Sequence, residues 1–366
     1  MAGALTVLHL DTERGWRGGE RQALWLAEGL AALGHRSLVA ARPEEPLAER
    51  AAAAGLSVVP CRPWGSGELD LAAAVALRGV VGRYAVDVVH AHTGHTVTLG
   101  ALATAGTGVP LVVTRRVDFP LRRNLGSRWK YGRAAAVIAV SDAVGRVLIA
   151  GGMAAERITV IPSGIDLRRR VAPASGETLR SLGVPGGAPL VVQVAQLVGH
   201  KDPVTFVRAV AAARVVVPSV QALLVGDGPL AGAVDAAVRE LGLEGVVHAV
   251  GYRTDADALI AAADVVTLSS REEGLGTVLL DAMAFGGAIA ATAAGGIPEM
   301  VEDGRTGLLA PVGDGAALGE RIGRLLTDRE LAARLRAGAR ERVTAFSVER
   351  TVERTVAVYE RVLGGI

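Results

Sequence analysis

Two glycines and the carboxylates of Glu273 and Asp281 stand close together in the stretch 269–284, directly after the apolar run 264–268. Gly274 and Gly276 let the backbone come close to a ligand, and the helix expected to begin there points unpaired amides and the positive end of its dipole outward. Such a turn binds a phosphate group well. Glu273 and Asp281 bracket the turn, about two helical turns apart. Because carboxylates repel phosphate, we expect these two to accept hydrogen bonds from sugar or ribose hydroxyls.

This E-x7-D spacing resembles the E-x7-E signature of the retaining, nucleotide-sugar-dependent glycosyltransferases of family 4, which have the GT-B fold. The resemblance implies that Glu273 orients hydroxyls of the donor sugar and that Asp281 binds the ribose. A surface Glu and a helix-facing Asp without any ligand are the alternative. The residues whose backbone is expected to contact the donor are Gly274, Leu275, Gly276 and Thr277.

A lone lysine follows the apolar run 189–194, in a chain whose only other lysine is Lys130. Family members usually read G-R-L-x-x-x-K here, and the Arg and Lys hold the donor phosphates. Lys201 matches that lysine, so the resemblance implies that it stabilises charge on the leaving diphosphate. Gln196 replaces the arginine, which predicts either weaker diphosphate binding or a substitute cation. A plain surface lysine is the alternative for Lys201.

Two further segments of the second half resemble donor-binding parts of the family. Gly228 belongs to a strand-G-x-G-P pattern, and Tyr252 and Arg253 follow a strand-like run where relatives hold the nucleobase partly through backbone groups. Asp255 and Asp257 form a D-x-D pattern like the metal motif of another glycosyltransferase fold. We interpret it as the start of a helix, because acids favour the first turn, and the GT-B resemblance implies no metal.

In the first half, Gly18 and Gly19 lie between an apolar run and an amphipathic helix-like segment. The stretch resembles the first loop of the family, where glycines approach the donor diphosphate and the acceptor. A pair of glycines before a helix is also a common turn, so this motif is weak by itself.

Three histidines lie at the end of the strand-like run 86–90, namely His90, His92 and His95. Ligands of parallel sheets bind beyond the carboxyl ends of the strands, which predicts that these histidines lie on the ligand side. The run resembles the D-V-V-H-x-H of the family, so we expect His92 and His95 on the acceptor side. A structural role and metal binding stay open as alternatives.

Arg116 follows the next strand-like run, 110–114, where many family members have the histidine of T-x-H near the reacting sugar. A guanidinium is always protonated and cannot act as a base, so its expected role is electrostatic, toward a phosphate or an anionic acceptor. The segment 121–133 then interleaves five cations with Trp129 and Tyr131, which suits a membrane interface or a phosphorylated acceptor. From this segment we expect Arg122 and Arg123 on the acceptor side.

Composition limits the class of protein. The chain has 366 residues, of which 50% are apolar and 3% aromatic, so its cores must consist of small aliphatic side chains. The single cysteine excludes an internal disulfide, and we see neither a signal peptide nor a membrane span. Residues 1–170 carry 21 basic and 14 acidic residues, a net charge of +7, whereas the remainder has 39−21=18 against 37−14=23, or −5. The basic half suggests an anionic acceptor or membrane surface; because the excess is local, we expect no nucleic acid.

Strand-like and helix-like runs alternate along the chain in the doubly wound α/β pattern. We therefore expect a GT-B fold, two Rossmann-like parallel-sheet domains facing a cleft. The predicted parts are an acceptor-side domain (1–170), a linker (171–187), a nucleotide-sugar-binding domain (188–346) and a helix that returns to the first domain (347–366).

The function implied by the resemblance is transfer of a hexose from a nucleotide diphosphate sugar, UDP- or GDP-linked, with retention of anomeric configuration and without a metal or other cofactor. We expect a cell-envelope glycan or lipid-linked acceptor in polysaccharide biosynthesis. The leaving phosphate would take the acceptor proton, and the protein would be cytoplasmic or peripheral at the inner face of the membrane. The alternatives are a non-catalytic sugar-nucleotide-binding or partner subunit and a sugar-nucleotide epimerase.

Overall fold

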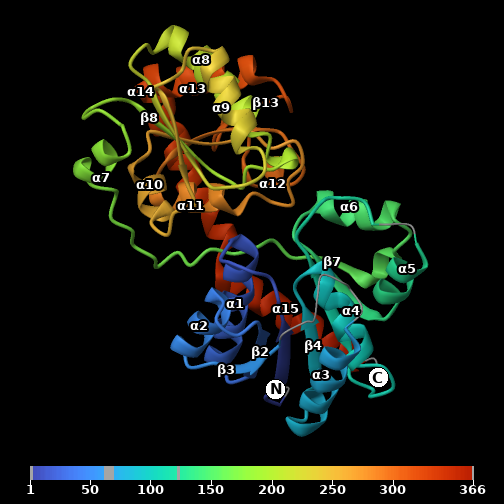
Figure 1. Ribbon diagram of the computed structural model, residues 1–366. Helices are drawn as coiled ribbons and strands as arrows, with labels where there is room; N and C mark the ends of the chain where they lie inside the picture. Colours follow the sequence, from blue (N-terminus) through green and yellow to red (C-terminus); the bar gives the residue numbers. More distant parts are fainter. Residues whose placement is uncertain (1–2, 62–69, 122–123, 365–366) are drawn as a thin grey trace. The chain divides into compact units, whose positions relative to one another are not determined.

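The structure is a computed structural model that describes residues 3–61, 70–121 and 124–364. The chain forms two compact units (Figure 1). The first comprises Met1–Gly164 together with Val348–Ile366, and the second comprises Ile165–Ser347. The chain thus enters the second unit at Ile165, and the predicted linker over 171–187 lies within that unit and contains the helix α7 (Gly176–Ser181).

The first unit is built on a seven-stranded, all-parallel sheet. Its strand order is β3-β2-β1-β4-β5-β6-β7, so the chain winds outward in one direction from β1 and then resumes in the other direction from β4. The strands are β1 (Thr6–Leu10), β2 (Arg36–Ala41), β3 (Ser57–Pro60), β4 (Val88–Ala91), β5 (Leu111–Arg115), β6 (Ala134–Ala139) and β7 (Ile158–Val160). This is the doubly wound order, in which the crevice for a ligand opens where the winding reverses, here between β1 and β4.

Four helices of the first unit, α3 to α6, begin directly after a polar residue that caps them. The side chains of Asp70, Thr93, Asn124 and Ser141 each accept a hydrogen bond from the backbone amide three residues on. The helices are α1 (Gly18–Ala32), α2 (Pro46–Ala53), α3 (Leu71–Arg83), α4 (Gly94–Ala103), α5 (Leu125–Gly132), α6 (Asp142–Ala150) and α15 (Val348–Gly364).

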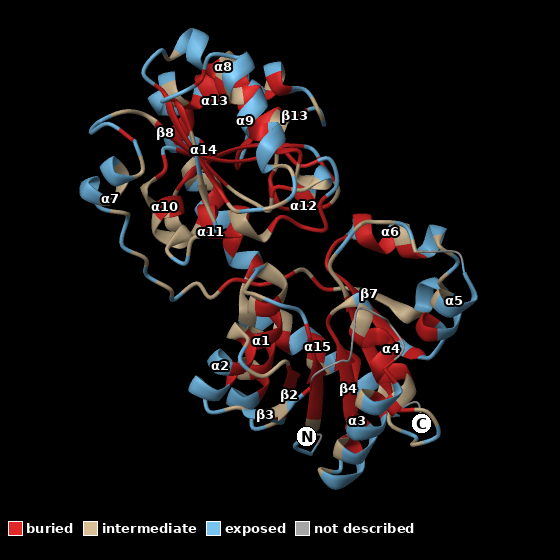
Figure 2. Cartoon of the chain, in the orientation of Figure 1, coloured by how far each residue is buried: buried red, intermediate tan, exposed pale blue. Residues whose placement is uncertain are grey.

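The last helix, α15, belongs to the core of the first unit although it is the final element of the chain. Its apolar positions repeat at helical spacing, and Val352, Val358 and Tyr359 are buried against Val7 and Leu26 on β1 and α1. Figure 1 shows α15 in red beside the blue strands of this unit, and Figure 2 shows β1 and β2 as mostly buried. Residues more than 300 positions apart therefore share one core.

The second unit repeats the same architecture with six parallel strands in the order β10-β9-β8-β11-β12-β13. The reversal of winding lies between β8 and β11. The strands are β8 (Leu190–Val194), β9 (Gln221–Val225), β10 (Val247–Gly251), β11 (Val265–Leu268), β12 (Ala288–Thr292) and β13 (Leu308–Ala310). The remaining helices are α8 (Pro203–Val216), α9 (Ala231–Glu240), α10 (Ala256–Ala262), α11 (Thr277–Phe285), α12 (Ile297–Met300), α13 (Gly315–Thr327) and α14 (Arg329–Arg342).

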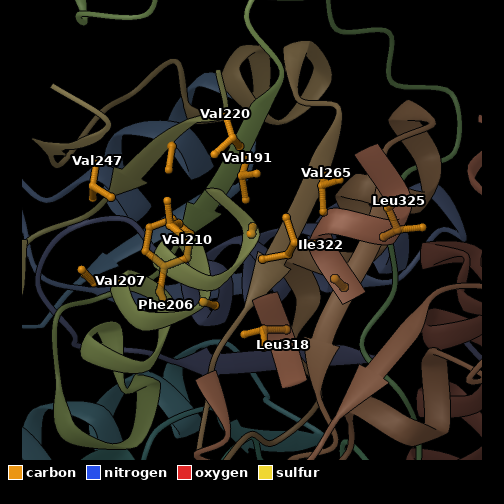
Figure 3. Packing of buried hydrophobic residues seen from close by; sticks show 14 of the residues in the cluster. Val191, Phe206, Val207, Val210, Val220, Val247, Val265, Leu318, Ile322 and Leu325 are labelled. Atoms are coloured by element: carbon orange, nitrogen blue, oxygen red, sulfur yellow. The ribbon is translucent and has the colours of Figure 1, made fainter. Parts of the chain in front are cut away.

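Aliphatic side chains fill the core of the second unit, as the low aromatic content predicts. Phe206 is the one aromatic residue in the buried cluster that α8 and α13 form with the sheet. Figure 3 shows Phe206 beside Val207, Val210 and Val247, with Leu318 and Ile322 of α13 approaching from another side. Two doubly wound parallel sheets thus confirm the predicted fold class.

Two glycines after β9 allow two loops of the second unit to touch. Gly226 and Gly228 have φ values of +136° and +154°, which side chains of L-residues rarely adopt. A Cβ on Gly226 would lie 2.0 Å from the carbonyl oxygen of Ala195, and one on Gly228 would lie 2.5 Å from that of Leu197. The glycines therefore let the segment after β9 pack against the segment after β8.

This close approach predicts a large effect for Gly226→Ala. The clash and the unfavourable φ should destabilise the second unit by about 3 kcal/mol, or a fall in Tm of about 6–12 °C. Differential scanning calorimetry of the ligand-free protein measures it. Gly232→Ala on α9 is the matched control, because a Cβ there meets nothing within 4 Å. Equal Tm values for the two variants would contradict the predicted contact.

Candidate active site

The loops after β8 and β11 are tied together by a buried polar network in the second unit. The side-chain amide of Gln193 makes two hydrogen bonds with Ser269. Gln193 Nε2 donates to Ser269 Oγ at 3.1 Å, and the backbone amide of Ser269 donates to Gln193 Oε1 at 3.1 Å. Ser269 Oγ also lies 2.8 Å from the carbonyl oxygen of Asp202, to which it donates. All three residues are buried, so the bonds are strong, and they fix the segment that carries Lys201 against the end of β11.

Lys201 and Glu273 form an ion pair at this edge of the sheet. Glu273 is buried, and its Oε2 also accepts a hydrogen bond from Ser270 Oγ at 3.1 Å. The backbone amide of Arg271 donates to the carbonyl of His200 at 2.8 Å, which holds the two loops side by side. The structure therefore brings together two residues 72 positions apart that were both predicted to act on the donor.

The turn between Glu273 and α11 has the geometry that anion binding requires. Gly276 is the N-cap of α11 with φ +87°, and Thr277 is the first residue of the helix. The first amides of a helix have no partner inside it, and they point in the same direction as the positive end of the helix dipole. Gly274 and Leu275 are buried in the same turn. The predicted turn before a helix is thus present, and its phosphate binding stays a prediction.

Asp281 has a partner that its sequence context does not reveal. It is buried on α11, and Arg169 Nη1 donates to its Oδ1 at 3.2 Å. Arg169 also pairs with Asp257 in the first turn of α10, and its guanidinium lies 5.5 Å from the centre of the Phe285 ring. The predicted ribose acceptor is therefore held by a guanidinium from the segment between Ile165 and α7.

The other predicted donor residues of the second unit lie after β8, β9 and β10. Gln196 precedes Leu197, whose backbone packs against Gly228. Tyr252 is 53% exposed directly after β10. Arg253 forms a two-pronged ion pair with Asp255, with both N–O distances 2.7 Å, and this raises the pKa of Arg253 and lowers that of Asp255. Asp255 occupies the N-cap position of α10, as its interpretation as a helix start predicts.

In the first unit, three polar side chains meet at the carboxyl ends of neighbouring strands. Asp11, His92 and Arg116 are each the first residue after β1, β4 and β5, respectively. Arg116 Nη1 donates to the carbonyl oxygen of His92 at 3.2 Å, and Arg116 Nη2 lies 3.3 Å from His92 Nδ1. Glu20 of α1 is close enough to Asp11 and Arg116 to influence the pKa of both. We call Asp11, Glu20, His9, His92 and Arg116 the strand-end cluster.

The donor and acceptor roles in this cluster follow from the guanidinium, which can only donate. Since Arg116 donates to His92 Nδ1, the neutral His92 carries its proton on Nε2 and donates it to His9 Nδ1 at 3.0 Å. Neutral His9 must then carry its proton on Nε2. Burial and, to a smaller extent, Arg116 lower the pKa of His9 to about 3, and burial with neighbouring His90 and Arg116 lowers that of His92, so both rings are neutral.

His90 is the third buried histidine at this edge. Its Nδ1 lies 2.6 Å from the hydroxyl of Tyr359 on α15, and its Nε2 lies 2.7 Å from Thr114 Oγ1. In the described residues, His9, His90 and His92 could each offer one metal-ligand atom, all within 4.8 Å of one another. A divalent ion fits this set poorly, because both nitrogens of His90 are engaged and the cationic Arg116 lies against His92.

The remaining predicted residues of the first unit are distributed around this edge. Gly18 and Gly19 form the first turn of α1, which begins two residues earlier than the sequence pattern predicts. A Cβ on Gly19 would lie 4.0 Å from Arg116 Cδ, so this glycine lines the cluster. His95 is on the first turn of α4 and is not part of the histidine cluster. Arg122 and Arg123 lie outside the described residues.

Two carboxyls in the strand-end cluster have raised pKa values. Asp11 is 1% exposed, and burial, followed by the nearby Glu20, raises its pKa from 3.8 to about 7. Burial likewise raises the pKa of Glu20, although Glu20 Oε2 accepts a hydrogen bond from the amide of Arg17 at 2.8 Å. Burial lowers the pKa of Arg116, and the two carboxyls oppose that change. Titratable groups with pKa values perturbed in this way concentrate at functional sites.

Sequence reasoning missed several of these residues. Asp11 is polar and directly follows an apolar strand, the signal that identified His92, and it could have been found in the same way. His9 also stands out as a polar residue inside an apolar strand. Arg169, Gln193 and Ser269 gave no local signal, because their roles depend on partners at least 67 positions away.

Family models match both units. The model for glycosyl transferases group 1 matches residues 175–342, and the model for Glycosyltransferase Family 4 matches residues 16–169. The chain therefore belongs to the family 4 glycosyltransferases with the GT-B fold, which confirms the resemblance drawn from its motifs. None of the helices in the described residues is long and apolar enough to cross a membrane.

Relatives and solved structures match over most of their length. The chain is 33% identical over 262 residues to the 2-deoxystreptamine glucosyltransferase of Streptomyces kanamyceticus, covering 70% of this chain and 67% of the relative. It is 32% identical over 311 residues to the alpha-maltose-1-phosphate synthase of Mycolicibacterium smegmatis, with 76% and 80% covered. The structure of Anabaena HepE in complex with UDP and glucose matches with a TM-score of 0.85 and 24% identity, over 98% of this chain and 100% of that one. That structural match shows the shared fold.

The raised pKa of Asp11 predicts how stability changes with pH. A folded-state pKa above the unfolded value of 3.8 means that Asp11 favours folding when protonated, so this contribution is present below about pH 4 and is lost as the pH rises through 7. The loss is on the order of 4 kcal/mol. Asp11→Asn keeps the shape without the charge, and it should raise Tm at pH 8 by about 5 °C or more, with the difference shrinking toward pH 4.

Thermal unfolding across this pH range measures the effect. Glu13→Gln is the control, because Glu13 is an exposed carboxylate two residues away. A lower Tm for Asp11→Asn than for the unmodified protein at pH 8 would show that Asp11 is stabilised in its ionised form, contrary to the predicted direction.

Proposed function

We propose that the chain transfers a hexose from a nucleotide diphosphate sugar to a hydroxyl of an acceptor, with retention at the anomeric carbon and without a metal ion. The observation that carries this proposal is the Lys201–Glu273 pair beside the amino end of α11, at the edge where the winding of the second sheet reverses. A cation and a set of amides suit a diphosphate, and a buried carboxylate beside them suits sugar hydroxyls.

In the proposed reaction, the bond between the anomeric carbon and the leaving phosphate oxygen breaks, and the acceptor oxygen bonds to the same face of that carbon. The acceptor proton passes to the leaving phosphate. Lys201 and the amides of Gly274 to Thr277 stabilise the negative charge that grows on the diphosphate. Glu273 orients hydroxyls of the donor sugar. Asp281 accepts a hydrogen bond from the ribose, and Arg169 fixes the direction of its carboxylate.

A UDP- or GDP-linked sugar is the proposed donor, supported by the UDP and glucose bound in the matching Anabaena structure. The proposed acceptor is a cell-envelope glycan or a lipid-linked saccharide at the inner face of the membrane. The exposed Leu125 and Trp129 on α5, four positions apart beside Arg128, support peripheral contact with an anionic surface. 2-Deoxystreptamine is a second candidate acceptor, because one relative is a 2-deoxystreptamine glucosyltransferase.

A panel of UDP- and GDP-sugars tests the proposal. Thermal shift identifies the donor, and hydrolysis of that donor, assayed in the presence of EDTA, measures turnover in water. Nuclear magnetic resonance of the freshly formed product gives its anomeric configuration. Binding without any turnover would instead assign the chain as a non-catalytic sugar-nucleotide-binding subunit, and an altered sugar on the nucleotide would assign an epimerase. Loss of turnover in EDTA that added divalent metal restores would contradict metal independence.

Glu273→Gln should remove most turnover without unfolding the protein. The change keeps the size of the side chain but removes the carboxylate that accepts hydrogen bonds from sugar hydroxyls and pairs with Lys201. We therefore expect kcat to fall roughly 100-fold or more if the contact acts in the transition state. Steady-state donor turnover measures it. Glu272→Gln is the matched control, because Glu272 is the next residue in the chain and its carboxylate is exposed. Rates within twofold of the unmodified protein for both variants would remove Glu273 from the proposed mechanism.

Arg116 is proposed to supply the cation that Gln196 does not. Under this proposal Arg116→Ala is severely impaired, and adding Gln196→Arg restores part of the activity, so the two changes are non-additive. A double-mutant cycle on kcat/KM for the donor measures the coupling. Simple additivity, or a loss confined to acceptor KM, would place Arg116 at the acceptor instead.

A further inference from the structure

The strand-end cluster of the first unit contains buried polar atoms that have no partner. Within the described part of the chain, neither Asp11 Oδ2 nor His9 Nε2 makes a hydrogen bond, and each side chain is 1% exposed. Arg116 Nε is also buried without a hydrogen-bond partner, although the Arg116 side chain as a whole is only partly buried. Leaving a buried donor or acceptor unpaired costs about 1–3 kcal/mol for each group. Groups of this kind at the edge of a sheet where ligands bind indicate a binding function.

The unpartnered atoms have complementary hydrogen-bonding character. The relay from Arg116 through His92 leaves the Nε2–H of His9 as a donor. Asp11 Oδ1 accepts from the amide of Glu13 at 3.2 Å, which leaves Oδ2 as an acceptor. His9 and Asp11 are two positions apart on β1 and its extension, so their side chains lie on the same face, about 7 Å apart along the chain. A hydroxyl oxygen can accept a hydrogen bond from the Nε2–H of His9 and donate one to Asp11.

The charges of the strand-end cluster determine which chemical groups can bind favourably beside His9 and Asp11. Glu20 and Asp11 flank the single cation Arg116, so the sum of the three charges is zero when one carboxyl is protonated and −1 when both are ionised. A phosphate has only acceptor oxygens at neutral pH and would face the carboxylate of Asp11. A hydroxyl satisfies both unpartnered atoms, and an ammonium group satisfies the carboxylate.

We infer that Asp11 and His9 bind a hydroxyl of the acceptor and that Asp11 makes the first unit select neutral or cationic acceptors over phosphorylated ones. This inference rests on the proposed transferase function and adds the acceptor class to it. It replaces the sequence-based expectation that the basic first half receives an anionic acceptor at Arg116.

Three sugars that differ at one position test the inference: glucose, 6-amino-6-deoxyglucose and glucose 6-phosphate. Their dissociation constants for the full chain, saturated with UDP, are measured by nuclear magnetic resonance titration at pH 8. We expect the hydroxyl and ammonium sugars to bind at least about tenfold more tightly than the phosphate sugar, which corresponds to one well-placed charge contact. In Asp11→Asn this preference should shrink about tenfold, whereas Glu13→Gln should keep it.

Each outcome decides the inference. Equal binding of the three sugars, tighter binding of glucose 6-phosphate, no binding of any of them, or an unchanged preference in Asp11→Asn overturns it. UDP binding, measured in the same samples by thermal shift, separates this inference from the proposed function: a protein that binds UDP but shows no preference retains the function and loses the inference. Unfolding curves for both variants establish that each is folded at the titration temperature.

Discussion

The structure depends on the reversal of strand order in each parallel sheet. Where the winding reverses, the connections from two adjacent strands leave toward opposite faces, so their loops separate and the carboxyl edge of the sheet is accessible. This happens between β1 and β4 in the first unit and between β8 and β11 in the second. The loops at these two places carry Asp11 and His92 in one unit, and Lys201 and Glu273 in the other. The same topological constraint thus places both candidate sites.

The buried polar side chains at the two sheet edges differ in how their charges are balanced. In the second unit opposite charges are paired, as in Lys201–Glu273 and Arg169–Asp281, and the Gln193–Ser269 bonds hold the loops that carry them. In the proposed function, a diphosphate bound there would meet charges whose positions are already fixed, which would reduce reorganisation during the reaction. In the first unit two neutral histidines and a carboxyl of raised pKa surround one cation. That set is better suited to hydroxyls than to phosphates.

At two positions where the chain departs from the family pattern, Asp281 and Arg116, the structure shows contacts that accompany the change. Asp281 is one methylene shorter than the usual glutamate, and here Arg169 anchors it from outside α11. Arg116 replaces a histidine, and its charge is balanced by Asp11 and Glu20 within the same unit. The raised pKa of Asp11 predicts that this cluster lowers the stability of the folded protein near neutral pH, because the folded state favours protonated Asp11. Retaining a carboxyl under that penalty is typical of a residue kept for binding or catalysis.

The sequence by itself determined the fold class, the family and the residues of the turn that begins α11. Alternating apolar runs predict two doubly wound sheets, and short motifs fix Gly276 and Glu273 relative to the start of α11, because the residues that make a turn are neighbours in the chain. Only the tertiary structure decided that Arg169 holds Asp281, 112 residues away, that His9 rather than His95 joins the buried histidines, and that Asp11 lies beside Arg116. These pairings depend on strand order and register, which bring distant residues together through packing of the whole sheet and leave no signal in the local pattern.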